Sequence, residues 1–302
     1  MFRVSILGHK AIKGNDSFST RAKGYLKAFT ALGADAGYYC LNNFHYQING
    51  KKDGFYYEGG KFIDTDLTFI LSAHSNYLLS YYDVFRLIKM KSGFMVNDPE
   101  ALLNGKNKFL TGMLLKQAGV AVPRTWMVTK SSWNYVADKL SFPVIVKKVI
   151  GSKGVGVMKF DSFSSLSSFF DFYFKGNNDP QGLIVQEYIS ESNATDFRVV
   201  VVNRKVILTM RRKGQDPKKN FRSNVAQGAV PSACKTDPVM SALAIKATEA
   251  LGLFLSGVDI MKSHDGYKVL EVNSTPFIDI EQEIADQNLF KLIAKECLNL
   301  LG

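Results

Sequence analysis

The order of hydrophobic and polar residues along the 302-residue chain predicts a protein in which strands and helices alternate. Between residues 17 and 32, apolar residues return every three or four positions, which is the spacing of one helix face. Short, uninterrupted apolar runs elsewhere in the first third are typical of buried strands. The elements expected here are strands at 2–8 and 67–71, helices at 17–32 and 78–90, and a hairpin that turns at Glu58-Gly59-Gly60. They predict a small α/β domain with a mostly parallel sheet over residues 1–95.

A second unit is expected to begin near Val96-Asn97-Asp98-Pro99, because proline suits the first turn of a helix. Beyond this point strands dominate the pattern. The strands are expected at 143–149, 155–160, 182–188, 196–202, 205–212, 255–262 and 267–273, and the helices at 98–104, 106–118, 163–174, 237–251 and 283–300. The chain as a whole is therefore predicted to be of the α/β (α+β) class, with a polar loop from Lys213 to Asn220.

The strand expected at 143–149 ends in Lys147 and Lys148 and leads into a glycine-rich turn, Gly151-Ser152-Lys153-Gly154-Val155-Gly156. Glycines allow backbone N–H groups to approach a phosphate chain closely. The spacing is not that of a P-loop, and no helix follows it as the dinucleotide fingerprint requires. A phosphate-binding loop and an ordinary flexible hairpin therefore both remain open for this segment.

The apolar strand Ile184-Val185-Gln186-Glu187-Tyr188-Ile189 turns polar at its end. Its backbone could bond the edge of an adenine ring, and Glu187 could accept a hydrogen bond from a ribose hydroxyl. An edge strand would have the same pattern, so this segment by itself does not decide between the two. Asp196 follows Glu187 by nine residues and begins another apolar strand.

Two strands near the C-terminus carry acids in otherwise apolar surroundings. Asp259 lies in one, and Glu271 and Asn273 share one face of the next, because side chains alternate along a strand. The turn His264-Asp265-Gly266 predicts that the two strands pair antiparallel, so that Asp259 can face Glu271. Two carboxylates and an amide oxygen are ligands that suit Mg²⁺. A solvated sheet face is the alternative, although buried carboxylates need partners.

Composition and charge narrow the class of protein. The chain is 46% apolar and 22% charged, which excludes a disordered protein. Its 38 Lys and Arg exceed its 27 Asp and Glu, and the net charge of +11 favours an anionic partner. The excess is concentrated in residues 204–222, which include Arg211, Arg212 and Arg222, whereas residues 231–302 are net acidic. Clustered arginines can bind phosphate or carboxylate oxygens, and a solvated charged surface is the alternative.

The cysteines and the N-terminus bear on the compartment. Cys40, Cys234 and Cys297 are scattered, which argues against a disulfide framework or a zinc site and fits a reducing cytoplasm. The first strand lacks the features of a signal peptide, and no window approaches the roughly 18 apolar residues that a membrane span needs. A cytoplasmic protein without a membrane partner is therefore expected.

Taken in order, these motifs resemble the ATP-grasp superfamily, and within it the RimK-like group of the ribosomal protein S6 glutamate ligase. The resemblance covers residues 95–302 well and residues 1–95 only by their general pattern. The matching segments are Asn107-Lys108, Pro143 to Lys147, Gly151 to Val157, Val185 to Ile189, Asp196-Phe197-Arg198, Arg211-Arg212, Phe221 to Asn224, Gly257-Val258-Asp259 and Leu270 to Asn273. The resemblance implies an ATP-grasp fold, in which two α+β lobes, 96–185 and 186–302, clasp ATP behind the N-terminal domain.

The resemblance also implies an ATP- and Mg²⁺-dependent carboxylate–amine ligase. A substrate carboxylate would take the γ-phosphate of ATP to give an acylphosphate and ADP, and an amine would then displace phosphate to form an amide. Two Mg²⁺ ions are expected, with Mn²⁺ as an alternative, on Asp259, Glu271 and Asn273. Arg212 and Arg222 are the expected catalytic residues. The expected ATP-binding residues are Lys108, Lys147, Gly151, Ser152, Gly154, Val155, Gly156, Gln186, Glu187, Tyr188, Ile189, Asp196, Arg211 and Asn224.

The positions at which this sequence departs from the family pattern are ones expected to determine which substrate is bound. Asn273-Ser274-Thr275-Pro276-Phe277 has phenylalanine where the family commonly has glycine, and Ser72-Ala73-His74 stands where the S6 ligase type tends to carry an arginine. The expected substrates are therefore an amino acid, an acidic peptide or a protein tail, without a commitment to glutamate. A homo-oligomer is left open.

Two alternative functions are kept. One is an ATP-grasp phosphotransferase that leaves phosphate on the acceptor and forms no amide. The other is a basic nucleic-acid-binding protein, which the sequence disfavours because basic and aromatic residues do not interleave as in RNA-binding platforms.

Overall fold

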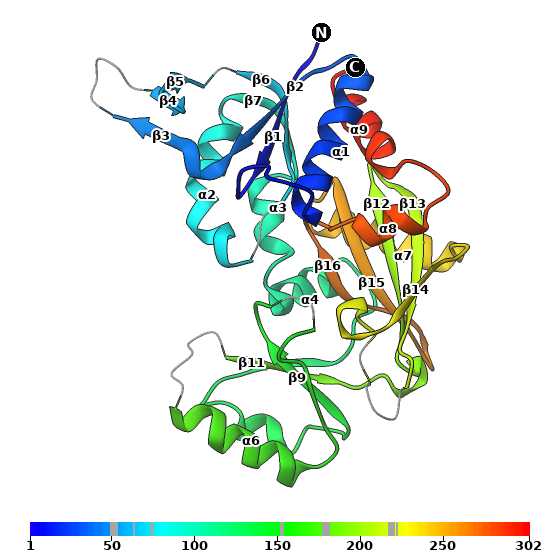
Figure 1. The fold of residues 1–302 in the computed structure, drawn as a ribbon. Helices are drawn as coiled ribbons and strands as arrows, with labels where there is room; N and C mark the ends of the chain where they lie inside the picture. Colours follow the sequence, from blue (N-terminus) through cyan, green and yellow to red (C-terminus); the bar gives the residue numbers. More distant parts are fainter. Residues whose placement is uncertain are drawn as a thin grey trace.

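Four sheets organise the computed structural model, in which residues 1–48, 54–62, 64–72, 75–151, 154–176, 182–216, 221 and 223–302 are described. Figure 1 shows an N-terminal domain, a large sheet beside it, and a lobe around α6 that projects from both. The chain ends lie near each other, where α1 (Ser17–Ala31) and α9 (Leu289–Leu298) run side by side. Mixed helices and sheets of this kind confirm the predicted α/β class.

The N-terminal domain is built on a parallel sheet in the order β2-β1-β6-β7. Its strands are β1 (Arg3–Gly8), β2 (Asp35–Cys40), β6 (Thr65–Ile70) and β7 (Ser92–Val96), and its helices are α1 and α2 (Ser75–Lys89). A small antiparallel sheet of β3 (Phe44–Gln47), β4 (Gly54–Tyr57) and β5 (Gly60–Lys61) adjoins it. The parallel sheet and the hairpin turning after Tyr57 were both predicted, and both are confirmed.

The projecting lobe is an antiparallel sheet in the order β10-β9-β11-β8. Its strands are β8 (Thr125–Val128), β9 (Val144–Lys148), β10 (Met158–Phe160) and β11 (Leu183–Glu187). The aromatic face of α6 (Phe163–Gly176) packs on one side of this sheet and closes a core that includes Val146, Phe170 and Val185. The helices α3 (Pro99–Asn104) and α4 (Lys108–Gln117) lead into the lobe, and α5 (Asn134–Ala137) lies within it.

The large sheet is antiparallel in the order β14-β13-β12-β15-β16. Its strands are β12 (Thr195–Val202), β13 (Lys205–Lys213), β14 (Val230–Ala233), β15 (Leu255–Ser263) and β16 (Gly266–Asn273). α7 (Pro238–Ala250) packs on one face of this sheet, toward which Val199 and Val201 point. Because side chains alternate along a strand, Val200 and Val202 point to the opposite face, toward α1 and α9. Register pairs Asp259 with Glu271, as predicted.

Several elements differ from the sequence-based expectations. The single helix expected at 283–300 is two helices, α8 (Asp279–Ile284) and α9, because Ala285 is extended and the side chain of Asn288 caps α9 by accepting from Lys291 N. The strands β2, β3, β7, β8 and β14 and the helix α5 were not predicted. Among the described residues, no helix is long and apolar enough to cross a membrane.

Asn97 joins the N-terminal domain to the large sheet. The residue is buried, and its side chain donates to the carbonyls of Leu255 (2.7 Å) and Ser274 (2.6 Å). Its Oδ1 accepts from the backbone N–H groups of Phe254 (2.8 Å) and Leu255 (2.9 Å). One side chain therefore fixes both the start of β15 and the segment that follows β16, which carry the candidate site.

Candidate functional site

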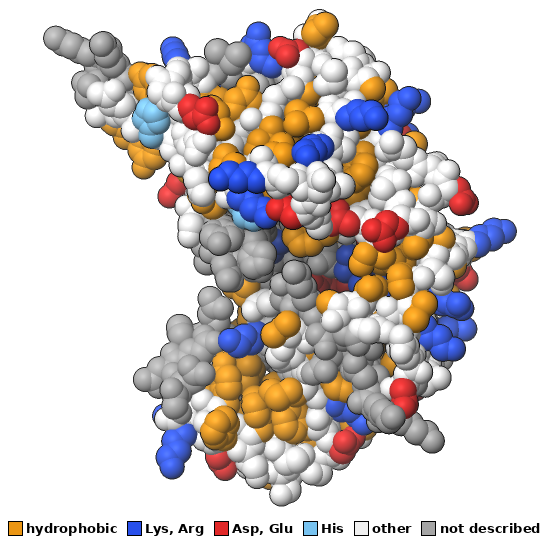
Figure 2. Space-filling view, viewed as in Figure 1, with side chains coloured by type: hydrophobic (Ala, Val, Ile, Leu, Met, Phe, Trp, Pro, Cys, Tyr) orange, Lys and Arg blue, Asp and Glu red, His pale blue; other side chains and the backbone are white. Residues whose placement is uncertain are grey.

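A cavity of about 410 Å³ lies between the sheet of the projecting lobe and the large sheet. Figure 2 shows the molecule hollowed between this lobe and the rest of the chain. Most of the residues that the sequence singled out line it together. They are Lys108, Lys147, Gly151, Gly154, Val155, Gln186, Glu187, Tyr188, Ile189, Asp196, Arg212, Asn224, Asp259, Glu271 and Asn273.

Four predicted residues are not placed in the cavity. Arg211 is exposed and lies on the opposite side of β13 from Arg212, because side chains alternate along the strand. Gly156 belongs to the glycine-rich turn but is not among the residues that line the cavity. Ser152 and Arg222 lie outside the described residues. The expectation that Arg211 binds ATP beside a catalytic Arg212 overlooked the alternation of side chains along the strand.

Lys147 enters the cavity from β9, where Ile184 of β11 pairs with it. Its Nζ donates to Oε1 of Gln186 at 2.9 Å, and Gln186 in turn donates to Oγ1 of Thr125 at 2.8 Å. Burial is the main reason that the pKa of Lys147 falls to about 8, and the charge of Lys108 lowers it further. The ammonium group is therefore held in a dry position where an anion would stabilise it.

Glu187 bridges the projecting lobe and the large sheet. Its carboxylate accepts from Nε of Arg124 at 3.0 Å and from Nζ of Lys268 on β16 at 2.9 Å. Burial would raise the pKa of Glu187, but these two cations outweigh it and lower the pKa. The two walls of the cavity are thus connected at the end where the polar terminus of β11 lies.

The glycine-rich turn approaches the large-sheet part of the chain through Gly154. This residue has φ of +69°, and a β-carbon on it would lie 2.6 Å from Oδ1 of Asn224. At the start of the turn, Nζ of Lys108 donates to the carbonyl of Gly151 at 2.7 Å. A side chain at position 154 would therefore require both an unfavourable backbone conformation and a displaced neighbour.

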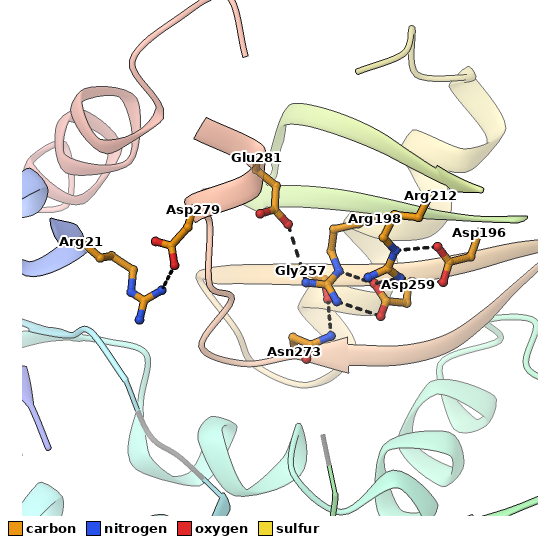
Figure 3. Close-up of polar contacts among 9 residues, drawn as sticks. All are labelled: Arg21, Asp196, Arg198, Arg212, Gly257, Asp259, Asn273, Asp279 and Glu281. Atoms are coloured by element: carbon orange, nitrogen blue, oxygen red, sulfur yellow. Dashed lines mark hydrogen bonds and ion pairs between the residues drawn. The ribbon is translucent and has the colours of Figure 1, made fainter. Parts of the chain in front are cut away.

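A cluster of buried charges fills the floor of the cavity (Figure 3). Arg212 donates to both carboxylate oxygens of Asp196 at 2.6 Å and lies 3.1 Å from Asp259. Arg198 also binds Asp259 with two bonds, of which the Nη2–Oδ2 bond is 2.9 Å, and its Nη1 lies 3.8 Å from Glu281 of α8. Two guanidinium groups are therefore surrounded by three carboxyl groups.

The pKa values of this cluster follow from burial and pairing. Burial would raise the pKa of Asp259, but Arg198 and Arg212 outweigh it and lower the pKa. Burial raises the pKa of Asp196 against the opposing charge of Arg212, and it raises the pKa of Glu281 against that of Arg198. Asp259, which contacts both arginines, is consequently the most firmly ionised acid of the three.

The residues expected to bind a divalent cation fit that role by their donor atoms. In the described ranges, no three His, Cys, Asp or Glu side chains gather as a metal site, so a cation would depend on Asp259, Glu271 and an amide oxygen. The Nδ2 atom of Asn273 donates to the carbonyl of Gly257 at 3.3 Å, so Oδ1 is the side-chain atom that could contact a cation. Hard oxygen donors of this kind suit Mg²⁺.

The N-terminal domain reaches the edge of the site through Arg21 of α1. This arginine is buried, binds Oδ2 of Asp279 at 2.6 Å, and lies 4.3 Å from the centre of the Phe277 ring. Phe277 also lines the cavity. Of the segment 72–74, Ala73 and His74 lie outside the described residues.

Several residues of the site were not assigned a role from sequence. Arg198 lies in the quoted Asp196-Phe197-Arg198 segment, and its alternation with Asp196 on one strand face was a usable signal. Lys106 and Glu281 line the cavity as well, but no local pattern distinguishes them from surface charges. Arg124 and Lys268 come from distant segments and meet only at Glu187.

Comparison with known protein families assigns the greater part of the chain to one family. The model of the RimK-like ATP-grasp domain matches residues 105–296. The chain is 33% identical over 247 residues to a "Probable alpha-L-glutamate ligase 1" of Shewanella sp. (strain W3-18-1), covering 80% of this chain and 79% of that protein. A protein of the same name from Shewanella baltica (strain OS155) has the same identity and coverage.

Comparison with solved structures shows the same fold along the whole chain. The ATP-grasp ligase PsnB complexed with minimal precursor has a TM-score of 0.73 at 16% identity, over 99% of this chain and 98% of that one. The macrocyclase MdnC from Microcystis aeruginosa MRC, bound with its precursor peptide MdnA, has a TM-score of 0.70 at 14% identity, over 98% and 99%.

Proposed function

The chain belongs to the RimK-like ATP-grasp family of ATP-dependent ligases, which form amide bonds, and we propose from this premise how its own residues serve the reaction. The observation that carries the proposal is one cavity that gathers Lys108 and Lys147 with Asp259, Glu271 and Asn273. Lysines suit the phosphates of ATP, and the oxygen donors suit Mg²⁺. We expect two Mg²⁺ ions, which Mn²⁺ could replace.

In this proposal, the adenine end lies where Glu187 meets Lys268, and the backbone of 187–189 bonds the base. Lys147 and Lys108 hold the phosphates, and the glycine-rich turn covers them. Bound Mg²⁺ would neutralise phosphate charge at Asp259, Glu271 and Asn273. The protein's contribution is mainly positioning and electrostatic stabilisation, because phosphoryl transfer needs little covalent chemistry from it.

In the same proposal, Arg198 and Arg212 stabilise negative charge at the acceptor end. A substrate carboxylate attacks the γ-phosphate, the bond between the β- and γ-phosphates breaks, and an acylphosphate and ADP result. An amine then attacks the acyl carbon, the C–O bond to phosphate breaks, and an amide and phosphate result. The guanidinium groups are fixed by Asp196 and Asp259, so little reorganisation is required as charge develops.

The substrate is proposed to be an amino acid or a peptide. Relatives of this chain are named alpha-L-glutamate ligases, and structural neighbours are complexed with precursor peptides, which supports this class. The basic segment 204–222 favours an acidic peptide or protein tail. Phe277, supported by Arg21, narrows the acceptor end compared with a glycine at that position.

The test is release of ADP and phosphate from ATP and MgCl₂ with a panel of free amino acids and glutamate-terminated peptides. We expect release that depends on the amine, and a product mass equal to the two substrates less one water. Lys147→Ala should lower turnover by about 10²-fold or more, whereas Lys262→Ala, an exposed strand lysine, should not. A product that gains phosphate, or no amine-dependent release across the panel, would contradict the proposal.

A further inference from the structure

We propose that Lys106 binds the terminal phosphoryl group of the bound nucleotide, at the acceptor end of the cavity. The inference rests on the proposed function and adds to it a third lysine, which the sequence motifs did not indicate. Lys106 lines the cavity, is partly buried, and precedes the cap residue of α4. Its position, its packing and the absence of an ion pair to it within the described part of the chain carry the argument.

The first step is the order of residues along β16. Lys268 contacts Glu187, and Glu271 lies 3.5 Å from Nζ of Lys108. Thr275, just beyond the strand, accepts from Nζ of Lys106 at 3.4 Å. A strand advances about 3.3 Å per residue, so these contacts are spread along the cavity in that order. With adenine near Glu187, Lys106 lies beyond Lys108, where the last phosphate would be.

The second step is the packing that holds Lys106 in this position. A β-carbon at Gly105 would lie 2.8 Å from Cβ of Ser274 and 3.3 Å from the carbonyl of Val272. The turn between α3 and α4 is therefore pressed against the segment that follows Asn273. On the other side, Oδ1 of Asn107 accepts from the first N–H groups of α4 at 3.0 and 3.1 Å. The backbone of Lys106 is fixed at both ends.

The third step is the charge balance of the cavity. Lys108 lies 3.5 Å from Glu271, and Arg198 and Arg212 each bind buried carboxylates. Among the ion pairs of the described residues, Lys106 has none, and its only side-chain hydrogen bond there is the long one to Thr275. Burial, as the largest cause, lowers its pKa to about 8, although Glu271 opposes this.

These steps point to an anionic ligand. A partly buried ammonium group without a carboxylate partner is costly, and an anion within hydrogen-bond distance would offset that cost. Lys147, the other described lysine with a lowered pKa, already donates to Gln186 on the side of β11. Of the partly buried lysines that line the cavity within the described ranges, Lys106 is thus the one with neither an ion pair nor a short hydrogen bond, and it lies toward the end of the nucleotide that ADP lacks.

The experiment compares the affinities of AMPPNP and ADP, each with Mg²⁺, by isothermal titration calorimetry. Lys106→Gln should weaken AMPPNP by about tenfold, as expected for a hydrogen bond to a charged group, and change ADP by less than about twofold. Lys106→Arg, which keeps the charge, should retain most of the AMPPNP affinity. Lys116→Gln, an exposed lysine of α4, is the matched control and should change neither.

The outcomes separate this inference from the proposed function. If Lys106→Gln weakens AMPPNP and ADP equally, or weakens neither, Lys106 does not contact the terminal phosphoryl group and the inference is overturned. If the unmodified protein binds neither nucleotide, the proposed function itself fails, and the inference fails with it. Thermal unfolding of each variant checks that the fold is kept, and Lys106→Arg provides the comparison should the glutamine variant not fold.

Discussion

At the scale of the residue, the buried charges on the floor of the cavity are paired with one another, and this pairing sets their pKa values. Arg198 and Arg212 are held by three buried carboxyl groups, and the arrangement leaves Glu281 with the longest contact, 3.8 Å. Burial accordingly raises the pKa of Glu281, while it is Asp259 that the arginines keep ionised. The carboxyl groups of Glu281 and Asp259 thus have opposite pKa shifts within one cluster, because Asp259 contacts both arginines and Glu281 contacts one at a longer distance.

The raised pKa of Glu281 predicts a pH-dependent stability. The folded protein holds this proton more tightly than the unfolded chain, so the contribution of Glu281 to stability falls as pH rises above the ordinary glutamate range. Glu281→Gln does not titrate. The free energy of unfolding of the variant, relative to that of the unmodified protein, should therefore increase as pH rises above the ordinary glutamate range, as measured by urea unfolding at a series of pH values.

Glu283→Gln, on the same helix but exposed, is the matched control for this prediction. It should change the free energy of unfolding by less than about 0.5 kcal/mol, because its side chain is exposed and loses few contacts. A stability difference for Glu281→Gln that stays constant or shrinks with rising pH would mean that Glu281 is ionised in the folded protein throughout this range.

At the scale of the element, the glycine-rich turn is the part whose backbone most directly limits substitution. Gly154 and Gly156 have φ of +69° and +72°, so both favour glycine. They differ in surroundings, since a β-carbon at Gly156 meets nothing within 4 Å whereas one at Gly154 meets Asn224. Substitutions at these two glycines therefore distinguish the effect of backbone strain, which both positions share, from the effect of the contact with Asn224, which only position 154 has.

Gly154→Ala is expected to weaken nucleotide binding by about tenfold more than Gly156→Ala, because it also displaces a wall of the cavity. Titration with ADP and Mg²⁺ would measure both. In the background of Asn224→Ala, which removes the obstructing amide, the two alanine variants should become equivalent. Equal losses in the original background would show that strain, and not the contact with Asn224, limits the turn.

At the scale of the whole molecule, the C-terminal helix packs against the N-terminal domain. α9 packs on α1, and Ile293 and Leu289 share one buried core with Phe29, Phe69 and residues of the large sheet. The projecting lobe has its own core. We retain the division at 1–95, 96–185 and 186–302 as a proposal for the chain, but expect the first and last segments to fold together.

Ile293→Ala is expected to lower the free energy of unfolding by about 2–5 kcal/mol, as for other large-to-small changes in a core. Both tryptophans, Trp126 and Trp133, lie in the projecting lobe, so their fluorescence reports on that lobe while far-UV circular dichroism reports on the whole chain. The circular dichroism transition should shift more than the fluorescence transition.

Lys291→Ala, an exposed change on the same helix, is the control and should shift neither transition. A fragment of residues 1–95, which lacks α9, is expected to show no cooperative unfolding, because part of its core would face water. A cooperatively folded fragment, or equal effects of Ile293→Ala and Lys291→Ala, would contradict the shared core.

The motifs that are continuous in sequence could be predicted, because the residues that form each motif are neighbours along the chain. The alternation in β15 and β16 and the turn between them were enough to predict that Asp259 opposes Glu271. The break between α8 and α9 was missed, since it depends on a cap at Asn288 within an otherwise helical pattern. The placement of Arg211 was also missed, although strand alternation indicated it.

The sequence by itself determined the α/β class, the family and the short segments that supply the cavity. The tertiary structure decided which of their side chains meet: Glu187 with both Arg124 and Lys268, Arg198 with Glu281, and Lys106 with Thr275. Local periodicity reports which face of an element is buried. Pairing between charges depends on contacts between segments far apart in the chain, and only the packing of the sheets and helices establishes those.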